Sequence, residues 1–291
     1  MQSTIQSPLQ PTEQSTASSP SQPYIAFIGA GNMSRAIIGG MLKNGYPAAH
    51  IFATGRDIKK LEDLAAKGIK TATDNAQALL ASDIVVLGVK PQLMQSVVSP
   101  LASIAQQRQP LFVSVAAGVT SQSIERWLGG DLAVVRCMPN TPALVQLGAS
   151  ALCANAKVSD SQKLIAQQVI ATTGIALWVE NETQLDAVTA LSGSGPAYFF
   201  MLMESMIDAA VSQGLSREVA EQLALQTASG AAAIARQSDL SPAQLKQQVM
   251  SPKGTTEQAV LSFEKAGFAQ IIKNGMQANV DRSQQLAKEL A

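Results

Sequence analysis

YIAFIGAGNMSRAII, residues 24–38, is an apolar run that stops at glycines and then continues with helical spacing. This pattern predicts a buried strand that turns into a helix. Gly29 would permit the tight turn, and Gly31, which has no side chain, would let a pyrophosphate approach the free N–H groups of the new helix. Ser34 occupies the third position of the glycine fingerprint, where a small residue still allows close helix–strand packing.

A glycine fingerprint alone is a weak signal, because an ordinary strand–helix turn also uses glycine. Here a strand precedes the glycines, a helix follows them, and a second strand at residues 50–54 arrives about where the motif requires it. We therefore predict that this turn binds a dinucleotide.

The alternation of helix and strand continues downstream, as in a nucleotide-binding domain. Helices are predicted over 57–67, from 74, over 91–107, from 120 and over 159–172, and strands over 68–71, 83–89, 111–115, 132–138, 148–154 and 174–179. We expect an α/β fold with a doubly wound, parallel, Rossmann-type sheet over residues 24–180. Residues 1–23, rich in Ser, Gln, Pro and Thr, are predicted to be a disordered tail without a signal peptide.

Loops at the carboxyl ends of the strands of such a sheet face the ligand crevice. The segments 88–91, 116–119 and 138–142 should therefore line one cleft, although prolines in such loops also serve as simple breaks between elements. The candidate cofactor-binding residues on these grounds are Gly29, Gly31, Ser34, Thr54, Arg56, Val89, Lys90, Pro91, Ala116, Gly118, Pro139 and Asn140.

Thr54-Gly55-Arg56 at the end of the second strand bears on the choice of cofactor. An NAD site usually has a carboxylate there for the ribose hydroxyls, whereas an NADP site accommodates the 2′-phosphate with arginine. Arg56 offers a planar fork that suits phosphate, so the sequence favours NADPH and leaves NADH possible. Asp57 is an acidic neighbour, and Arg56 could also be a solvated residue that opens the next helix.

The character of the chain changes after residue 180. We predict helices near 182–191, 196–213, 217–236, 242–250, 255–266 and 267–289, and hence an all-helical second domain over 181–291. These helices are too uniformly apolar for a layer with one solvent face, especially between Pro196 and Arg236. Two copies should bury them against each other, which predicts a homodimer and leaves larger assemblies open.

Composition excludes several classes of function. Formal net charge is zero and aromatic residues are 4%, which argues against a nucleic-acid surface. Cys137 and Cys153 are too few for a disulfide framework, and with a single histidine they form no metal site. No uncharged apolar run is long enough to cross a membrane, so we expect a soluble cytoplasmic protein.

A histidine acid is not expected, because His50 sits at the start of its strand, opposite the crevice. Related hydroxyacid dehydrogenases place a catalytic lysine early in the long helix after the sheet domain, where this chain has Gly195-Pro196-Ala197-Tyr198. That lysine is absent. An imine substrate that arrives protonated at neutral pH would need no strong protein acid.

LSGSGPAY at 191–198 and MSPKGTTE at 250–257 together resemble the pyrroline-5-carboxylate reductase family, which catalyses the last step of proline synthesis. Asn32-Met33, Val89-Lys90-Pro91 and residues 138–142 match the same family, so the resemblance runs from about Tyr24 to the end of the chain. It adds Asn32 and Met33 to the cofactor-binding candidates. It also implies an NADPH-dependent hydride transfer to the C=N bond of 1-pyrroline-5-carboxylate, which yields L-proline.

The physics of the second motif agrees with this resemblance. Gly254 keeps the loop open, and Thr255, Thr256 and Glu257 begin a helix whose free N–H groups can hold a carboxylate without a basic side chain. By resemblance, the substrate carboxylate sits on this loop and the hydroxyl of Thr256, the catalytic candidate, hydrogen-bonds the ring nitrogen. The substrate-binding candidates are Ser251, Lys253, Gly254, Thr255, Thr256, Ser192 and Gly193.

Each motif also has a purely structural interpretation. SPKGTT can be a helix cap alone, and Gly195-Pro196 can be an ordinary helix start. A second functional hypothesis is a nucleotide-sensing protein that keeps the fold but has lost turnover, although the intact SPKGTT loop speaks against it. The resemblance finally implies that the loop at 251–257 meets the cofactor of a partner chain, so that the active site is shared.

Overall fold

The computed structural model describes residues 22–290. The predicted tail over 1–23 therefore lies outside the described residues, except for its last two positions. The carbonyl oxygen of Gln22 lies 2.9 Å from His50 Nδ1, and the Tyr46 hydroxyl donates to the carbonyl of Pro23. These two residues lie against the sheet domain.

An eight-stranded sheet forms the N-terminal half of the part that the structure describes, in the order β3-β2-β1-β4-β5-β6-β7-β8. β1 (Ile25–Ile28) lies between β2 (Ile51–Thr54) and β4 (Ile84–Leu87), and both pairings are parallel. All residues of β1 and β4 are buried, as expected for strands covered on both faces. The others are β3 (Lys70–Ala72), β5 (Leu111–Ser114), β6 (Val134–Met138), β7 (Gly148–Ala154) and β8 (Gly174–Trp178).

The order 3-2-1-4-5-6 of the first six strands is that of dinucleotide-binding folds, so the predicted Rossmann-type sheet is confirmed. The prediction of a wholly parallel sheet is wrong at one edge, because β7 runs antiparallel to β6. The connection between these strands spans residues 139–147 and contains only the turn η5 (Thr141–Val145), and a parallel neighbour would need a longer crossover. α7 (Asp160–Ala171) provides such a crossover between β7 and β8, which pair in parallel.

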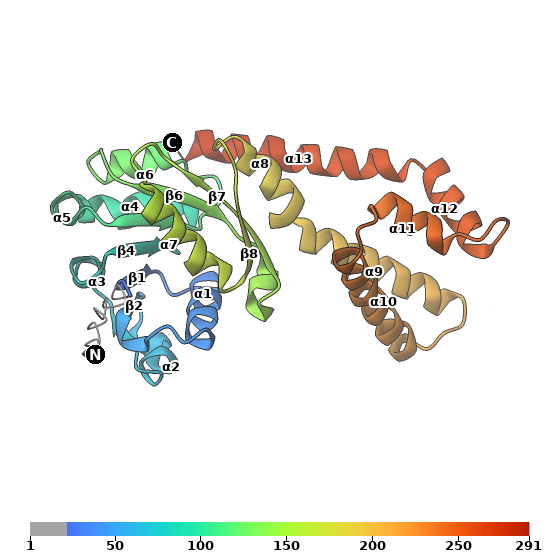
Figure 1. Ribbon diagram of the computed structural model, residues 1–291, viewed down its shortest axis with the longest axis horizontal. Coiled ribbons are helices and arrows are strands. Elements are labelled where there is room, and N and C mark those ends of the chain that lie inside the picture. Colours follow the sequence, from blue (N-terminus) through green and yellow to red (C-terminus); the bar gives the residue numbers. More distant parts are fainter. Residues whose placement is uncertain (1–21, 291) are drawn as a thin grey trace, which may run out of the picture.

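Helices cover both faces of the sheet (Figure 1). α1 (Asn32–Lys43), α2 (Glu62–Ala65) and α7 pack on one face, and α3 (Asn75–Leu80), α4 (Met94–Val98), α5 (Ala102–Arg108) and α6 (Ser121–Trp127) on the other. The helices predicted over 57–67 and 91–107 are interrupted by 3₁₀ turns, η2 (Ile58–Leu61), η3 (Pro91–Leu93) and η4 (Ser99–Leu101). Pro91 is the first residue of η3 and Pro100 the second of η4, and proline lacks the N–H that a continuing helix needs.

The helical arm, α8 to α13, contains no strand and extends from the sheet domain. α8 (Gln184–Val188) continues into a π-helical turn, η6 (Thr189–Gly193), where sequence predicts an uninterrupted helix to 191. α9 (Gly195–Ser212), α10 (Arg217–Gln237), α11 (Pro242–Val249), α12 (Thr255–Lys265) and α13 (Phe268–Glu289) follow within two residues of the predicted bounds. Figure 1 shows α9 to α12 leading away from the sheet and α13 returning to end beside α6.

Large apolar side chains on the arm are uncovered in a single chain. Phe199 is 63% and Phe200 62% exposed on α9, Leu223 is 55% exposed on α10, and Phe263 is 59% exposed on α12. Gly195 is the one buried residue of α9, so this helix has no core of its own. An apolar surface of this kind is typical of a protein–protein interface, in agreement with an arm that forms a homo-oligomer.

Candidate active site at the nucleotide cavity and the SPKGTT loop

The turn after β1 has the geometry that its glycines predict. Gly29 has a φ of +89°, and a Cβ there would lie 2.7 Å from Val89 Cγ1, so the position requires glycine. Gly31 is the N-cap of α1, and no side chain caps this helix. The N–H groups of its first turn are therefore open to an anion.

Ser34 fixes this turn from behind. Its side chain is buried, and its hydroxyl donates to the Gly29 carbonyl at 2.7 Å. A Cβ on Gly88 would lie 2.0 Å from Ser34 Oγ, so the glycine that ends the β4 strand is needed for close packing. Ser34 thus supports the turn rather than lining the cleft. Gly88, which sequence reasoning placed only in a loop, is part of the same packing.

A cavity of about 320 Å³ lies at the carboxyl ends of the central strands. Five of the predicted cofactor residues line it: Gly29, Gly31, Arg56, Val89 and Lys90. Lys60 also lines it, so three cationic side chains border one cavity. Such a concentration of positive charge suits a ligand that carries several phosphates. Lys60 was not predicted, because the sequence predicts a regular helix over 57–67. The structure has the 3₁₀ turn η2 there instead, and this turn places Lys60 at the cavity.

Asp57, the one acidic residue of the lining, serves the local backbone. Its Oδ1 accepts a hydrogen bond from the Lys59 N–H at 3.0 Å and caps the η2 turn. The sequence left open whether Asp57 could bind the ribose of a bound cofactor. In the structure this hydrogen bond directs the Asp57 carboxylate toward the η2 backbone and not toward a ribose. Arg56 makes no ion pair with another described residue.

Thr54 is fully buried and does not line the cavity. Its hydroxyl donates to Asn75 Oδ1 at 2.6 Å, and Asn75, at the start of α3, is a lining residue. Thr54 therefore orients Asn75 from behind. Asn75 was not predicted, and the signal that could have found it is its position after the third strand, where the crevice continues.

Several other predicted cofactor residues lie away from this cavity. Ala116 is buried, and a Cβ on Gly118 would lie 3.2 Å from Leu286 Cβ, so the 116–119 loop is covered by the end of α13. Pro139 is buried and Met33 packs against the core. Asn32 begins α1 and is exposed, and Pro91 begins η3. Each directly follows a lining residue in the sequence, but neither lines the cavity itself.

Asn140 links the sheet to the helical arm. Its Nδ2 donates to the Ser192 carbonyl at 3.0 Å, and its Oδ1 accepts from the Ala149 N–H at 2.9 Å. A Cβ on Gly193 would lie 2.5 Å from Met138 Cε, so the η6 turn sits directly on the end of β6. The predicted cofactor residue Asn140 and the predicted substrate residues Ser192 and Gly193 are thus in one contact cluster.

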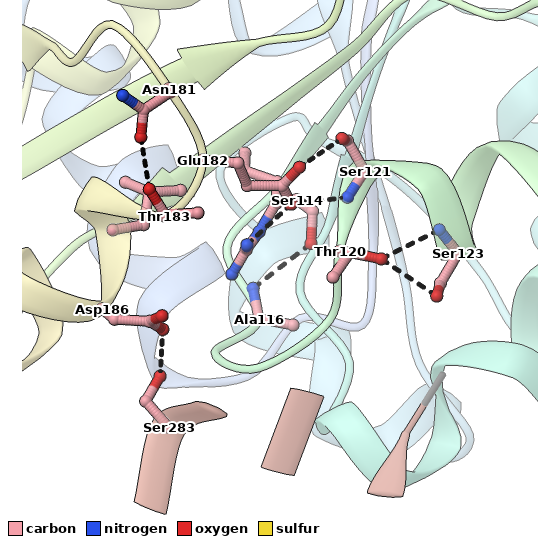
Figure 2. A network of polar contacts seen from close by, with 12 residues as sticks. Ser114, Ala116, Thr120, Ser121, Ser123, Asn181, Glu182, Thr183, Asp186 and Ser283 are labelled. Carbon is pink, nitrogen blue, oxygen red and sulfur yellow. Dashed lines mark hydrogen bonds and ion pairs between the residues drawn. The ribbon is translucent and has the colours of Figure 1, made fainter. Parts of the chain in front are cut away.

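A polar network at the junction fixes the arm (Figure 2). Glu182 accepts from the Ser121 N–H at 2.8 Å and from Arg136 at 2.7 Å, while its second oxygen accepts from the Ser121 hydroxyl at 2.7 Å. The Arg136 side chain is 12% exposed and that of Glu182 29%, so this ion pair is largely shielded from water. Ser283 of α13 donates to Asp186 of α8 at 2.7 Å.

The second predicted site is the loop before α12. Gly254 is the N-cap of this helix, and no side chain caps it, so the structure does not support SPKGTT as a side-chain cap. Glu257 Oε2 instead accepts from the Lys253 N–H at 2.7 Å, outside the helix. Thr255 and Thr256 occupy the first turn, where helical N–H groups lack intrahelical partners. Ser251 is exposed, and its carbonyl accepts from the Gly254 N–H.

The two sites are far apart within one chain. α12 packs against α13 at the distal part of the arm, and Figure 1 shows the loop between α11 and α12 at the opposite end from the sheet. The nucleotide cavity lies among β1, β2 and β4. The structure therefore does not bring Thr256 to the cavity of its own chain.

The remaining ionisable candidates lie outside both sites. His50 stacks on Tyr24 with ring centroids 4.2 Å apart and ends the turn η1 (Ala48–His50), so it lies directly before β2 and not within the strand as predicted. Cys137 and Cys153 are buried and free, and burial raises the pKa of the Cys137 thiol to about 12. Over residues 22–290, no three His, Cys, Asp or Glu side chains are grouped to hold a metal ion. The described helices include none with the length and apolar character of a membrane span.

Comparison with known proteins gives consistent matches. Residues 182–286 match the family described as pyrroline-5-carboxylate reductase dimerisation, and residues 24–118 match the family described as NADP oxidoreductase, coenzyme F420-dependent. The chain is 50% identical over 271 residues to pyrroline-5-carboxylate reductase of Pseudomonas aeruginosa, covering 93% of this chain and 99% of that protein. It is 40% identical to the Vibrio alginolyticus enzyme, covering 91% and 97%.

Solved structures of the same family are also similar to this chain. A pyrroline-5-carboxylate reductase from Coxiella burnetii is similar with a TM-score of 0.88 and 42% identity, covering 91% of this chain and 98% of that one. Pyrroline carboxylate reductase of Plasmodium falciparum, solved with NADP bound, is similar with a TM-score of 0.81 and 30% identity, with the same coverage.

Proposed function

The chain belongs to the pyrroline-5-carboxylate reductase family, and on that premise we propose how its two separated sites carry out the reaction. It is an NAD(P)H-dependent oxidoreductase that reduces the C=N bond of 1-pyrroline-5-carboxylate to give L-proline. What remains to be assigned is the preferred cofactor, the role of each residue and the chain that supplies it.

NADPH is the preferred cofactor in this proposal. Arg56 and Lys60 follow β2 and border the cavity, and Asp57 is engaged as a cap, so the end of β2 offers positive charge where the 2′-phosphate of NADPH would lie; Lys90, after β4, adds a third cation to the lining. Gly29 and Gly31 would admit the pyrophosphate to the start of α1. When bound, the reduced nicotinamide supplies the hydride, and the protein supplies orientation.

The substrate carboxylate is held by the first turn of α12. The open N–H groups of Thr255, Thr256 and Glu257 support this assignment, since a helix start without a side-chain cap attracts anions. The Thr256 hydroxyl would bond the ring nitrogen, with Ser251, Lys253 and Gly254 shaping the loop. The protein then aligns two bound molecules, and an imine that arrives protonated needs no further acid.

The site is shared between chains. The distance between the SPKGTT loop and the cavity in one chain, together with the uncovered apolar arm, supports an arrangement in which the loop of one chain meets the cofactor and the Ser192–Gly193 turn of its partner. The homodimer would form through the helical arm, over residues 181–291, and the nucleotide domain would cover 24–180. A cytoplasmic location is part of the proposal, and the proposal leaves open whether dimers assemble further.

One assay tests the reaction. Purified protein mixed with NADPH and 1-pyrroline-5-carboxylate should oxidise the cofactor, seen as falling absorbance at its near-ultraviolet band. Thr256→Ala should lower kcat/KM without changing the affinity for NADPH measured by fluorescence. Tight NADPH binding with no turnover at any pH near neutral would instead favour the alternative of a nucleotide sensor.

A further inference from the structure

Arg35, near the start of α1, joins two walls of the nucleotide cavity. Its Nε donates to the carbonyl of Ala30, in the turn after β1, at 3.1 Å. Its Nη2 donates to the carbonyl of Lys60 in η2, and its Nη1 donates to Asp63 Oδ2 of α2 at 2.5 Å. One guanidinium group therefore bonds the glycine turn on one side and the segment after β2 on the other.

Arg35 acts on the cavity from behind. Ala30 and Lys60 line the cavity, whereas Arg35 and Asp63 are not among its lining residues. The backbone of Lys60 is held on both sides, because its N–H donates to the Asp57 carbonyl at 3.2 Å and its own carbonyl accepts from Arg35. The side chain of Lys60 thus reaches the cavity from a backbone position that Arg35 helps to fix.

The segment that Arg35 holds has little regular structure of its own. η2 and α2 each span four residues. Elements this short make few internal hydrogen bonds, so their position depends on tertiary contacts. The buried side chains of Leu61 and Leu64 anchor the segment to the core, but apolar contacts are not directional. The directional bonds of Arg35 then set how the segment sits relative to the turn after β1.

The ion pair of Arg35 with Asp63 serves geometry more than stability. The hydrogen bond from Arg35 holds the pKa of the Asp63 carboxyl below its ordinary value, so this carboxylate is charged at neutral pH. The Arg35 side chain is 29% exposed and that of Asp63 56%. An ion pair this exposed contributes little to folding. It does orient the planar guanidinium group, whose other nitrogens bond the two cavity walls.

We propose that Arg35 is a positioning residue that sets the preference for NADPH over NADH. It joins the turn that admits the pyrophosphate to the turn that presents Lys60, and so fixes the spacing between the pyrophosphate and the cations that meet the 2′-phosphate. NADH lacks this phosphate and gains nothing from the fixed spacing. The inference rests on the proposed function, in which Arg56 and Lys60 bind the 2′-phosphate.

The first test compares Arg35→Met and Arg35→Lys in the full-length protein. Fluorescence titration measures the affinity for NADPH and for NADH, and competition with NADPH measures that for adenosine 2′,5′-bisphosphate, which has the 2′-phosphate but no nicotinamide. Arg35→Met should weaken binding of NADPH and of the bisphosphate roughly five-fold, the effect of about one lost hydrogen bond, and that of NADH less than about two-fold. Arg35→Lys should resemble Arg35→Met although it keeps the charge, because one ammonium nitrogen cannot span acceptors that three guanidinium nitrogens reach. The kcat and the KM for 1-pyrroline-5-carboxylate should hold.

Asp63→Ala separates positioning from charge. This change removes one acceptor of Arg35 together with a negative charge. If Arg35 acted by charge alone, Asp63→Ala would strengthen NADPH binding. Because Arg35 acts by position, Asp63→Ala should instead weaken NADPH binding roughly two-fold, in the range of an exposed ion pair.

A change of background tests whether Arg35 acts through the cations of the cavity. In a protein that already carries Arg56→Ala and Lys60→Ala, adding Arg35→Met should change the affinity for NADPH by less than about two-fold, because the effects of coupled residues do not add. Lys157→Met is the matched control. Lys157 and Asp131 form an exposed ion pair of the sheet domain outside the cavity lining, so both cofactor affinities should stay unchanged.

Equal losses of NADPH and NADH affinity in Arg35→Met, with a lower Tm, would overturn the inference, because they would assign Arg35 to the fold. Tighter NADPH binding in Asp63→Ala would also overturn it. If Arg56→Ala weakens NADPH and NADH binding equally, the proposed cofactor site fails first. If Arg56→Ala distinguishes the two cofactors and Arg35→Met does not, only the inference about Arg35 fails.

Discussion

The side-chain amide of Asn140 donates to the main-chain carbonyl of Ser192 at 3.0 Å and so joins the loop after β6 to the turn before α9. The same amide accepts the Ala149 N–H at 2.9 Å. With only 8% of Asn140 exposed, both bonds are shielded from water. The nucleotide half and the turn at 192–193 therefore share one side chain.

Asn140→Ala should disturb both halves. Losing two buried bonds should lower the free energy of unfolding by about 2 kcal/mol, measured by urea denaturation. Because the Ser192–Gly193 turn loses its support, kcat/KM for 1-pyrroline-5-carboxylate should fall about ten-fold. Asn44→Ala is the control, since its amide donates to the Gly40 carbonyl at the end of α1 and makes no bond to the turn. Equal loss of stability in both variants with no change in kcat/KM would mean that Asn140 serves the fold alone.

Arg56→Ala and Lys60→Ala should each raise the KM for NADPH and hardly change that for NADH, because only NADPH carries the additional phosphate. We expect an increase of roughly ten-fold for Arg56, whose fork can bind phosphate by two bonds, and less for Lys60. Initial rates at varied cofactor concentration measure both. Lys59→Ala should behave as the unmodified protein, since Lys59 is absent from the cavity lining. An equal rise in the KM for NADPH and for NADH would show that Arg56 supports the fold and does not bind the 2′-phosphate.

The shared site predicts complementation between inactive subunits. Thr256→Ala damages the substrate loop, and Gly31→Leu damages the nucleotide cavity. After chains exchange, a heterodimer should contain one site with both parts intact, so activity should recover to at most about a quarter of the unmodified level for random pairing. Mass spectrometry of labelled chains verifies the exchange. A stable dimer that exchanges without recovery would place each site within one chain, and light scattering that shows an active monomer would exclude the dimer.

Tyr46 predicts how stability changes at high pH. Burial, with a contribution from Asp83, raises the pKa of its phenol from 10.0 to about 12. The folded chain therefore holds this proton more tightly than the unfolded chain does. Its contribution to stability is complete below pH 10 and is lost as pH rises toward 12. Tyr46→Phe should flatten the fall of unfolding free energy across that window in urea titrations, and an unchanged slope would refute the assignment.

Much of the fold follows from the sequence because its signals are local. The β1 turn, the buried strands and the helices of the arm all show in hydrophobic period and in glycine or proline positions. The antiparallel direction of β7 is not visible in these signals. A buried strand has the same apolar composition whether it runs parallel or antiparallel to its neighbour. The interrupted helices over 57–67 and 91–107 were also missed, because apolar spacing continues through a 3₁₀ turn.

The site was predicted unevenly for the same reason. Gly29 and Arg56 were found because motif and position identify them, and both line the cavity. Lys60 and Asn75 reach it through turns that no motif marks. Thr54, Ser34 and Asn140 occupy the right segments, but their side chains are engaged in bonds to Asn75, Gly29 and Ser192. Which way a side chain points depends on tertiary contacts, and a sequence motif gives only the segment.

The polar junction between the sheet domain and the arm fixes the direction in which α9 leaves the sheet. Glu182 and Asp186 hold the arm by directional bonds, which fix an angle where apolar contacts would permit sliding. The 18 residues of α9 then set a length of about 27 Å. Deleting one residue from α9 would shorten the helix by about 1.5 Å and rotate the helices that follow it by about 100° about its axis. The spacing between the sheet and the distal loop is thus encoded in the residue count of a helix, and not only in the residues that touch a ligand.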